Sequence, residues 1–149
     1  MNTQFPNILL VEDNEDHAEL VMRCFEDHKI PNTIHHVSDG EMAINYLFGN
    51  NQYSDRAKYP IPNLILLDLR LPRIDGIEVL CRVKNSETLK KIPVVILTSS
   101  DNDKDLIKAY DNHVNSYVVK PLDFDKYIEL MDKLGIYWLG WNKTPIEKY

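Results

Sequence analysis

The sequence predicts an α/β fold in which a central five-stranded parallel sheet carries helices on both faces. Two observations indicate this class. Five short apolar runs alternate with segments whose apolar residues recur at helical spacing, and this alternation is typical of parallel sheets. The runs LILL at 64–67 and VVIL at 94–97 are continuously apolar, as strands buried on both faces must be.

The first unit is a strand expected at 7–13 and a helix expected at 14–28. The apolar run of the strand is too short for a helix and ends on Glu12 and Asp13. Asn14 is suited to cap the helix, because its side chain can accept hydrogen bonds from free backbone N–H groups. Helical spacing marks one apolar face. Its residues are Ala18, Val21, Met22 and Phe25.

The second and third units repeat this order. A strand at 32–39 precedes a helix at 40–50, and a strand at 64–68 precedes a helix at 76–85. The polar segment 51–62 between them contains two prolines and is expected to be a loop. The positions at helical spacing are Met42, Ala43, Tyr46 and Leu47, then Ile77, Leu80, Cys81 and Lys84.

The last two units complete the expected sheet. They place strands at 92–100 and 116–121 and helices at 103–113 and 123–139. Pro93 stands at the start of its strand, where a missing N–H group is tolerated. The core stripe of the last helix is expected to be Phe124, Tyr127, Ile128, Met131 and Leu134.

Composition restricts the function classes. A chain of 149 residues with 44% hydrophobic residues fits one domain with a substantial core. The net charge of −6 argues against non-specific binding to nucleic acid or to an anionic membrane. No apolar run approaches the roughly 20 residues of a membrane span, and Cys24 and Cys81 suggest no disulfide framework. We therefore expect a cytoplasmic protein that is not anchored to a membrane.

Chemically active residues end four of the expected strands. The acids Glu12 and Asp13 end the first, Asp68 the third, Thr98 the fourth and Lys120 the fifth. Ligands bind outside the carboxyl ends of parallel strands, so these side chains are expected to converge at one edge. Three carboxylates favour a hard divalent cation such as Mg²⁺. Together with a lysine and a hydroxyl, they indicate phosphoryl transfer.

Four motifs carry a family resemblance. They are LLVEDN, LILLDLRLPRIDG, VVILTSS and YVVKP, and they occur in this order over about 6–134. With them the chain resembles the receiver domain of two-component response regulators, whose fold is a flavodoxin-like (βα)5 arrangement. The resemblance implies that residues 1–149 form a single receiver domain, with 135–149 as a C-terminal extension.

The resemblance also assigns the reacting groups. Asp68 is expected to accept a phosphoryl group from a sensor histidine kinase. Glu12, Asp13 and Asp68, with the backbone carbonyl of Arg70, are expected to bind Mg²⁺ or Mn²⁺. The chain is therefore expected to be a signalling protein that assists its own phosphorylation and dephosphorylation, rather than an enzyme acting on a separate substrate.

The remaining implied residues respond to the phosphoryl group. Lys120 is expected to pair with its oxygens, Thr98 to hydrogen-bond it, and Tyr117 to turn inward as an aromatic switch. The Lys120–Pro121 bond is expected to be cis. Gly76 is expected to help turn the chain sharply after the acceptor strand.

Two segments suggest a subgroup. The long connection at 50–63 and the sequence KKIPVVILTSS are similar to single-domain regulators that pair with phytochrome-type or other hybrid histidine kinases. Arg70 and Ser100 follow Asp68 and Thr98 by two positions, where they are expected to influence access of water. We expect Arg70 to alter the lifetime of the phosphorylated state, the alternative being a solvated surface arginine.

The C-terminal segment suggests an interface. Several apolar residues lie outside the expected core stripe, namely Leu130, Tyr137, Trp138 and Trp141. Aromatic residues are enriched at protein interfaces, so we expect a homodimer through 103–113, 116–121, 123–139 and this tail. The alternative is a tail that folds back on its own domain. No DNA-binding output unit is expected in the last residues.

Other readings remain. His35 and His36 are expected on opposite faces of a strand, and His17, His28 and His113 are interpreted as surface histidines. A dehalogenase-type phosphatase would need an acid where Arg70 stands, and the acids after the first strand would repel a flavin phosphate. A non-phosphorylated receiver-like interaction module and an intermediate in a multi-step phosphorelay remain alternative functions.

Overall fold

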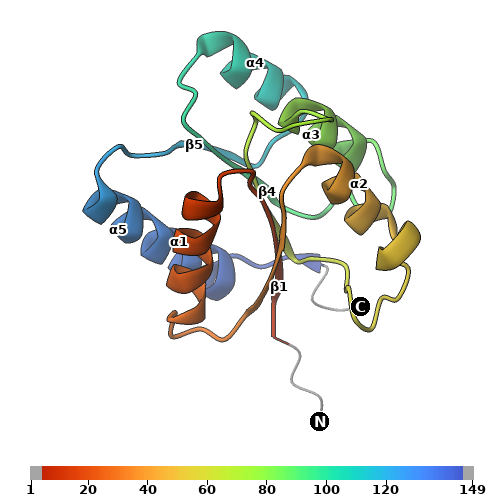
Figure 1. The fold of residues 1–149 in the computed structure, drawn as a ribbon, viewed down its shortest axis with the longest axis horizontal. Helices are drawn as coiled ribbons and strands as arrows, with labels where there is room; N and C mark the ends of the chain where they lie inside the picture. Colours follow the sequence, from red (N-terminus) through yellow and green to blue (C-terminus); the bar gives the residue numbers. More distant parts are fainter. Residues whose placement is uncertain (1–4, 146–149) are drawn as a thin grey trace.

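The computed structural model describes residues 5–145 and contains a five-stranded parallel sheet with the order β2-β1-β3-β4-β5 (Figure 1). The strands are β1 (Asn7–Val11), β2 (Thr33–Val37), β3 (Leu64–Leu67), β4 (Val94–Thr98) and β5 (Ser116–Val119). The α-helices are α1 (Glu15–Glu26), α2 (Gly40–Phe48), α3 (Gly76–Lys84), α4 (Asp103–Asp111) and α5 (Phe124–Gly135). A 3₁₀-helix η1 (Asn51–Tyr53) and a π-helical segment η2 (Ile136–Trp141) complete the elements. The predicted α/β class and flavodoxin-like fold are confirmed.

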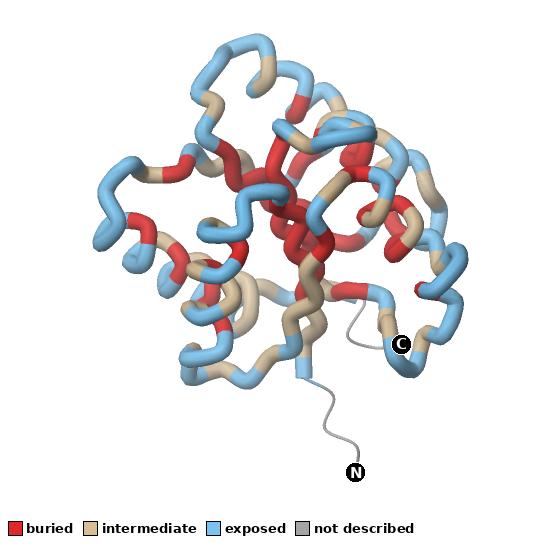
Figure 2. Tube along the Cα trace, in the orientation of Figure 1, coloured by how far each residue is buried: buried red, intermediate tan, exposed pale blue. Residues whose placement is uncertain are grey.

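The sheet separates two apolar clusters, and this explains the unbroken apolar strands. Ile8 and Leu10 of β1 pack in the cluster that contains residues of α1 and α5. Leu9 and Val11 alternate with them and pack in the cluster beneath α2, α3 and α4. The buried stretches accordingly gather at the centre of the molecule (Figure 2).

Each turn from a strand into a helix is closed by a polar side chain. In all five turns the residue before the helix accepts a hydrogen bond from a backbone N–H of the first turn, which satisfies a donor that the helix itself leaves free. These capping residues are Asn14, Asp39, Asp75, Asn102 and Asp123. The predicted cap at Asn14 is confirmed, and the five caps fix where each helix leaves the sheet edge.

The expected stripe of α5 is partly wrong. Tyr127 and Met131 are buried, but Phe124 is 63% exposed and Ile128 38% exposed. Leu130 and Trp138 pack against the core cluster instead. A helix on a sheet buries only a narrow stripe, and here the stripe runs along one side of the predicted face, so the flanking residues border a groove between α1 and α5.

Three further differences concern local structure. In α3 the buried side chains include Val79, Leu80 and Val83, whereas Cys81 is half-buried. The segment expected as a loop at 51–62 contains η1, and its Arg56 guanidinium donates to backbone carbonyls at the end of α2. The last helix ends at Gly135 and continues as the π-helical η2.

Within residues 5–145, no helix combines the length and the apolar composition that crossing a membrane requires.

Candidate functional site

The register of the sheet brings the strand-end residues together. Val11 pairs with Leu67 in the parallel ladder of β1 and β3, and the backbone N–H of Asp68 donates to the Val11 carbonyl at 3.0 Å. The next residues after these strands, Glu12 and Asp68, therefore leave the sheet side by side. The convergence expected from the sequence follows from this register.

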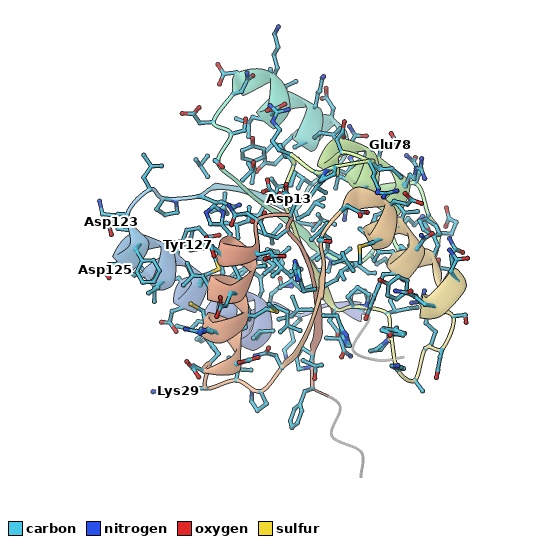
Figure 3. The ribbon with its side chains drawn as sticks, viewed as in Figure 1. Asp13, Lys29, Glu78, Asp123, Asp125 and Tyr127 are labelled. Carbon is cyan, nitrogen blue, oxygen red and sulfur yellow. The ribbon has the colours of Figure 1, made fainter. Side chains whose placement is uncertain are left out.

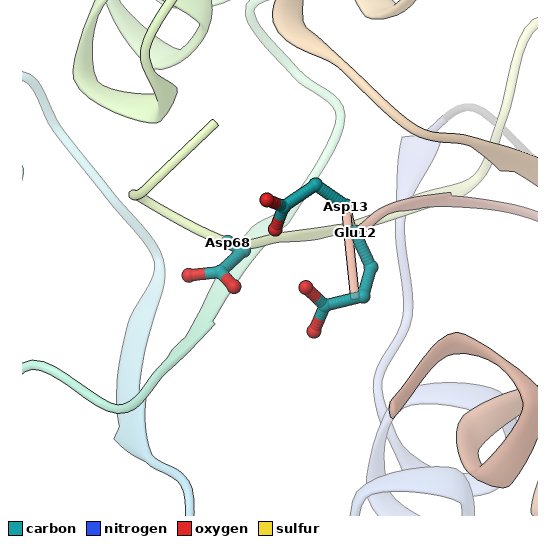
Figure 4. Close-up of side chains that lie close together, drawn as sticks. All are labelled: Glu12, Asp13 and Asp68. Carbon is teal, nitrogen blue, oxygen red and sulfur yellow. The ribbon is translucent and has the colours of Figure 1, made fainter. Parts of the chain in front are cut away.

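Three acids form one cluster at this edge. Glu12, Asp13 and Asp68 each place a carboxylate oxygen within 4.8 Å of the others, and their carboxylates face a common space (Figure 4). Glu12 and Asp68 are buried, whereas Asp13 is exposed. A set of carboxylate oxygens of this kind suits a hard divalent cation, so the residues present fit the expected metal.

A small cavity of about 210 Å³ opens beside the acids. Its lining combines both charge signs, which is suited to a cation together with an anionic group. The lining residues are Asp13, Asn14, His17, Asp68, Arg70, Ser99 and Lys120.

Lys120 is the buried cation of the site. Its Nζ donates to Glu12 Oε1 at 2.5 Å and to Asp68 Oδ2 at 3.1 Å. The side chain is only 4% exposed, so these partners replace the water that the ammonium loses. A buried charge is tolerated only with such compensation.

Burial and neighbouring groups shift the pKa values of the two buried acids in opposite directions. Burial raises the pKa of the Glu12 carboxyl to about 7, aided by the charge of Asp68 and opposed by the hydrogen bond from Lys120. Burial also tends to raise the pKa of Asp68, but hydrogen bonding with Glu12 and the charge of Lys120 lower it on balance. A proton on this pair is therefore held on Glu12 in preference to Asp68.

Backbone groups fix the orientation of Asp68. Its Oδ1 accepts from the N–H groups of Leu69 at 2.7 Å and Arg70 at 3.4 Å. Gly76 lies against the same turn, since a Cβ there would come within 2.2 Å of the Asp68 carbonyl oxygen. A side chain at this position would displace the acceptor strand, which gives the predicted Gly76 a physical reason.

The residues expected to switch are linked through Ser100. Its N–H donates to the hydroxyl of the fully buried Thr98 at 3.3 Å, and its carbonyl accepts from Tyr117 at 2.8 Å. Its hydroxyl donates to Asp105 Oδ2 at 2.6 Å, and Arg70 donates to the same oxygen at 2.6 Å. The loop after β4 therefore connects the mouth of the site with α4.

One predicted site feature is wrong. The Lys120–Pro121 bond, expected to be cis, is trans, as are all peptide bonds among the described residues. The trans form is the lower-energy isomer of an X–Pro bond by about 0.5–1 kcal/mol, and in this structure the strand end reaches the site without the cis isomer. The expected ligand role of the Arg70 carbonyl stays a prediction.

Two histidines contribute in ways that the sequence reasoning missed. His17, which the sequence predicts as a surface histidine, has a 39% exposed side chain, yet its Nδ1 lies 3.1 Å from Lys120 Nζ. The available signal was its place in the first turn of α1, only four positions after Asp13. His36 on β2 contacts the backbone carbonyl of Glu12 through Nε2 at 2.7 Å. Because a carbonyl only accepts, His36 donates and steadies the turn that carries two of the acids.

The chain matches the family model described as the response regulator receiver domain over residues 8–132. It is 48% identical over 138 residues to the probable methanogenesis regulatory protein FilR2 of Methanothrix harundinacea, covering 93% of this chain and 86% of that protein. It is 39% identical over 138 residues to the response regulator Rcp1 of Synechocystis, covering 93% of this chain and 92% of that protein.

Solved structures agree with this match. The phosphorylated cyanobacterial phytochrome response regulator RcpA superimposes with a TM-score of 0.91 at 36% identity, covering 95% of this chain and 99% of that one. The Mn²⁺-bound form of Rcp1 gives 0.89 at 37% identity, covering 94% and 99%. The resemblance predicted from the motifs, including the similarity to phytochrome response regulators, is confirmed.

Proposed function

Because the chain belongs to the response regulator receiver family, we propose that it accepts a phosphoryl group on Asp68 from a sensor histidine kinase. The observation that carries this is the setting of Asp68: a buried carboxylate that accepts from two backbone N–H groups on one oxygen and from Lys120 on the other. In the transfer, one Asp68 oxygen forms a bond to phosphorus while the bond from phosphorus to the kinase imidazole nitrogen breaks. The released nitrogen takes up a proton from solvent.

The proposed cofactor is Mg²⁺, with Mn²⁺ as a substitute. Glu12, Asp13 and Asp68 would hold the ion with the backbone carbonyl of Arg70. The bound cation would neutralise negative charge that the acids and the incoming phosphoryl oxygens share. The clustered carboxylates and the Mn²⁺-bound structure of a relative support this assignment.

The proposed response begins with a change in charge. Phosphorylation adds about −1.5 to −2 charges, which attracts Lys120 and the Thr98 hydroxyl toward the new oxygens. The Thr98 hydroxyl accepts a hydrogen bond from the Ser100 N–H, and the Ser100 carbonyl accepts one from the Tyr117 hydroxyl. Movement of Thr98 would therefore reach Tyr117 through one loop residue. We propose Tyr117 as the switch whose position alters the surface formed by α4, β5 and α5.

A homodimer through this surface is part of the proposal, with 135–149 as the extension of a single receiver domain. Exposed apolar side chains on α4, β5 and η2 favour it. They are Leu106, Ile107, Tyr110, Val119, Ile136, Tyr137 and Trp141. Light scattering on the full chain and on a chain truncated after Leu134 tests the idea, and a monomer in both would contradict it.

The proposed partners follow from the relatives. RcpA is named a phytochrome response regulator, so we propose a phytochrome-type or hybrid kinase as the phosphodonor, in the cytoplasm. The net charge of −6 opposes DNA as a partner, and we propose that the output is a protein contact.

The direct test is intact mass after incubation with Mg²⁺ and acetyl phosphate. We expect one added phosphoryl group in the wild type and in the exposed control Asp125→Asn. No addition is expected in Asp68→Asn or with EDTA. If Asp68→Asn gains the same mass as the wild type, the acceptor assignment is wrong.

A further inference from the structure

The Lys120 ammonium has three hydrogens and three neighbouring acceptors. Two of these are the carboxylates of Glu12 and Asp68, and the third is the imidazole of His17, whose Nδ1 lies 3.1 Å from Nζ. A charged lysine only donates hydrogen bonds. The contact therefore requires Nδ1 of His17 to accept, which leaves the ring neutral with its hydrogen on Nε2.

His17 is held in this place by two helices. Its backbone N–H donates to the capping side chain of Asn14 at 3.1 Å, in the turn that directly follows the acids. Its ring lies 5.9 Å from the ring of Tyr127, centroid to centroid, at an interplanar angle of 44°. Tyr127 is buried on α5 where that helix packs beside α1 (Figure 3). The imidazole is therefore supported from one side and faces the cavity with the other.

We propose that His17 is a positioning residue for phosphoryl transfer, which accepts a hydrogen bond from Lys120 and holds the ammonium beside Asp68. The proposal rests on the proposed function, because holding Lys120 beside Asp68 aids phosphoryl transfer only if Asp68 accepts a phosphoryl group. It goes beyond that function by assigning a role to a residue outside the set of acids, lysine and hydroxyl.

The neutrality of the acceptor is the physical reason for a histidine here. Three carboxylates already lie at this edge, and a fourth anion would increase their mutual repulsion. An imidazole nitrogen satisfies the third ammonium hydrogen without adding charge.

The contact also suits the loaded site. A bound cation and a phosphoryl group would contact the oxygens of Glu12 and Asp68. They would therefore compete with Lys120 for both of its carboxylate hydrogen bonds. His17 is not one of the three clustered acids, although its Nδ1 also lies 3.7 Å from Glu12 Oε1, and it can keep its hydrogen bond while Lys120 turns toward phosphoryl oxygens. Because this hydrogen bond persists, the ammonium has fewer free orientations before transfer and loses less orientational entropy when transfer occurs.

The test compares two substitutions in the full chain. His17→Leu removes the acceptor, whereas His17→Asn can place an amide oxygen near the position of Nδ1. With acetyl phosphate at saturating Mg²⁺, we expect His17→Leu to be phosphorylated about tenfold more slowly, as for loss of a hydrogen bond to a charged group. We expect His17→Asn to recover most of the rate. Glu19→Leu controls for a leucine on α1, since Glu19 contacts Arg23 and not the cavity.

A second readout follows the contact itself. Hydrogen exchange of the Lys120 ammonium, observed by NMR with ¹⁵N-lysine and identified by its absence in Lys120→Arg, should accelerate in His17→Leu and not in His17→Asn. Equal rates in His17→Leu and the wild type, or equal slowing in both variants, would overturn the proposal. If the wild type accepts no phosphoryl group, the proposed function fails, while the exchange measurement still decides whether His17 holds Lys120.

Discussion

Glu12→Gln should stabilise the metal-free protein at alkaline pH and have little effect at acidic pH. Glu12 has only a 3% exposed side chain, and burial raises its pKa from 4.5 to about 7 in the folded protein. Between these values the folded state binds more protons than the unfolded state, so stability falls as the pH rises through this window. The full rise in the pKa of Glu12 corresponds to about 3 kcal/mol of folding stability, at roughly 1.4 kcal/mol for each pKa unit.

The assay is urea unfolding in EDTA at pH 5 and pH 8. Glutamine resembles the protonated glutamic acid, because its carbonyl can accept from Lys120 and its amide can donate to Asp68. Part of the loss of wild-type stability has already occurred at pH 5. We therefore expect the difference in unfolding free energy between Glu12→Gln and the wild type to grow by about 2 kcal/mol between pH 5 and pH 8. Glu15→Gln, an exposed site at the start of α1, should show no such growth. An advantage of Glu12→Gln that is equal at pH 5 and pH 8 would refute the reasoning.

Three further predictions follow from the same edge of the sheet. If Glu12 binds Mg²⁺ as proposed, the ion competes with the Glu12 proton, so the Mg²⁺ affinity measured by calorimetry should fall by up to about tenfold for each pH unit below about 7; a pH-independent affinity would contradict this. Gly76→Ala should lower the unfolding free energy by more than about 2 kcal/mol in urea titrations, because the new Cβ meets the Asp68 carbonyl oxygen at 2.2 Å; an unchanged midpoint would count against the close approach. Because Arg70 is expected to limit access of water, decay of the phosphorylated mass should be faster in Arg70→Asn. It should be slower in Asp105→Asn, because loss of the 2.6 Å contact frees the guanidinium. Equal lifetimes of Arg70→Asn and the wild type would show that Arg70 does not affect the lifetime.

The sequence predicts the sheet and its reactive edge well, because both depend on short-range patterns. A continuously apolar run such as LILL has few alternatives to a buried strand. Once the strands are parallel, the residue after each strand must lie at one edge, whatever the exact helix packing. This is why the sequence alone predicts that Glu12, Asp68 and Lys120 lie together.

The residues that were misplaced depend on how a helix is rotated about its axis. Spacing shows that Phe124 and Ile128 share a face with Tyr127, but not how wide a stripe the sheet covers. The same uncertainty concealed His17, whose approach to Lys120 depends on Ala18 and Val21 facing the core. The link from Arg70 to Asp105 joins residues 35 positions apart, and no periodicity in the sequence encodes such a contact.

The environment of the three acids explains why Asp68 should be the one that reacts. A nucleophilic carboxylate must be ionised and fixed in direction. Glu12 is buried with a pKa raised to about 7, and Asp13 is exposed. Asp68 combines a lowered pKa with backbone N–H groups on one oxygen and Lys120 at the other.

This reasoning predicts what happens when the acceptor is removed. Asp68→Asn incubated with acetyl phosphate and Mg²⁺ should carry no phosphoryl group at Asp13 or Glu12, as judged by peptide mass spectrometry. The amide keeps a similar shape and can still accept the backbone hydrogen bonds, so the neighbouring acids remain in place and available. Phosphorylation of Asp13 at a rate near that of Asp68 in the wild type would mean that proximity to the metal, and not the fixed orientation of the carboxylate, selects the acceptor.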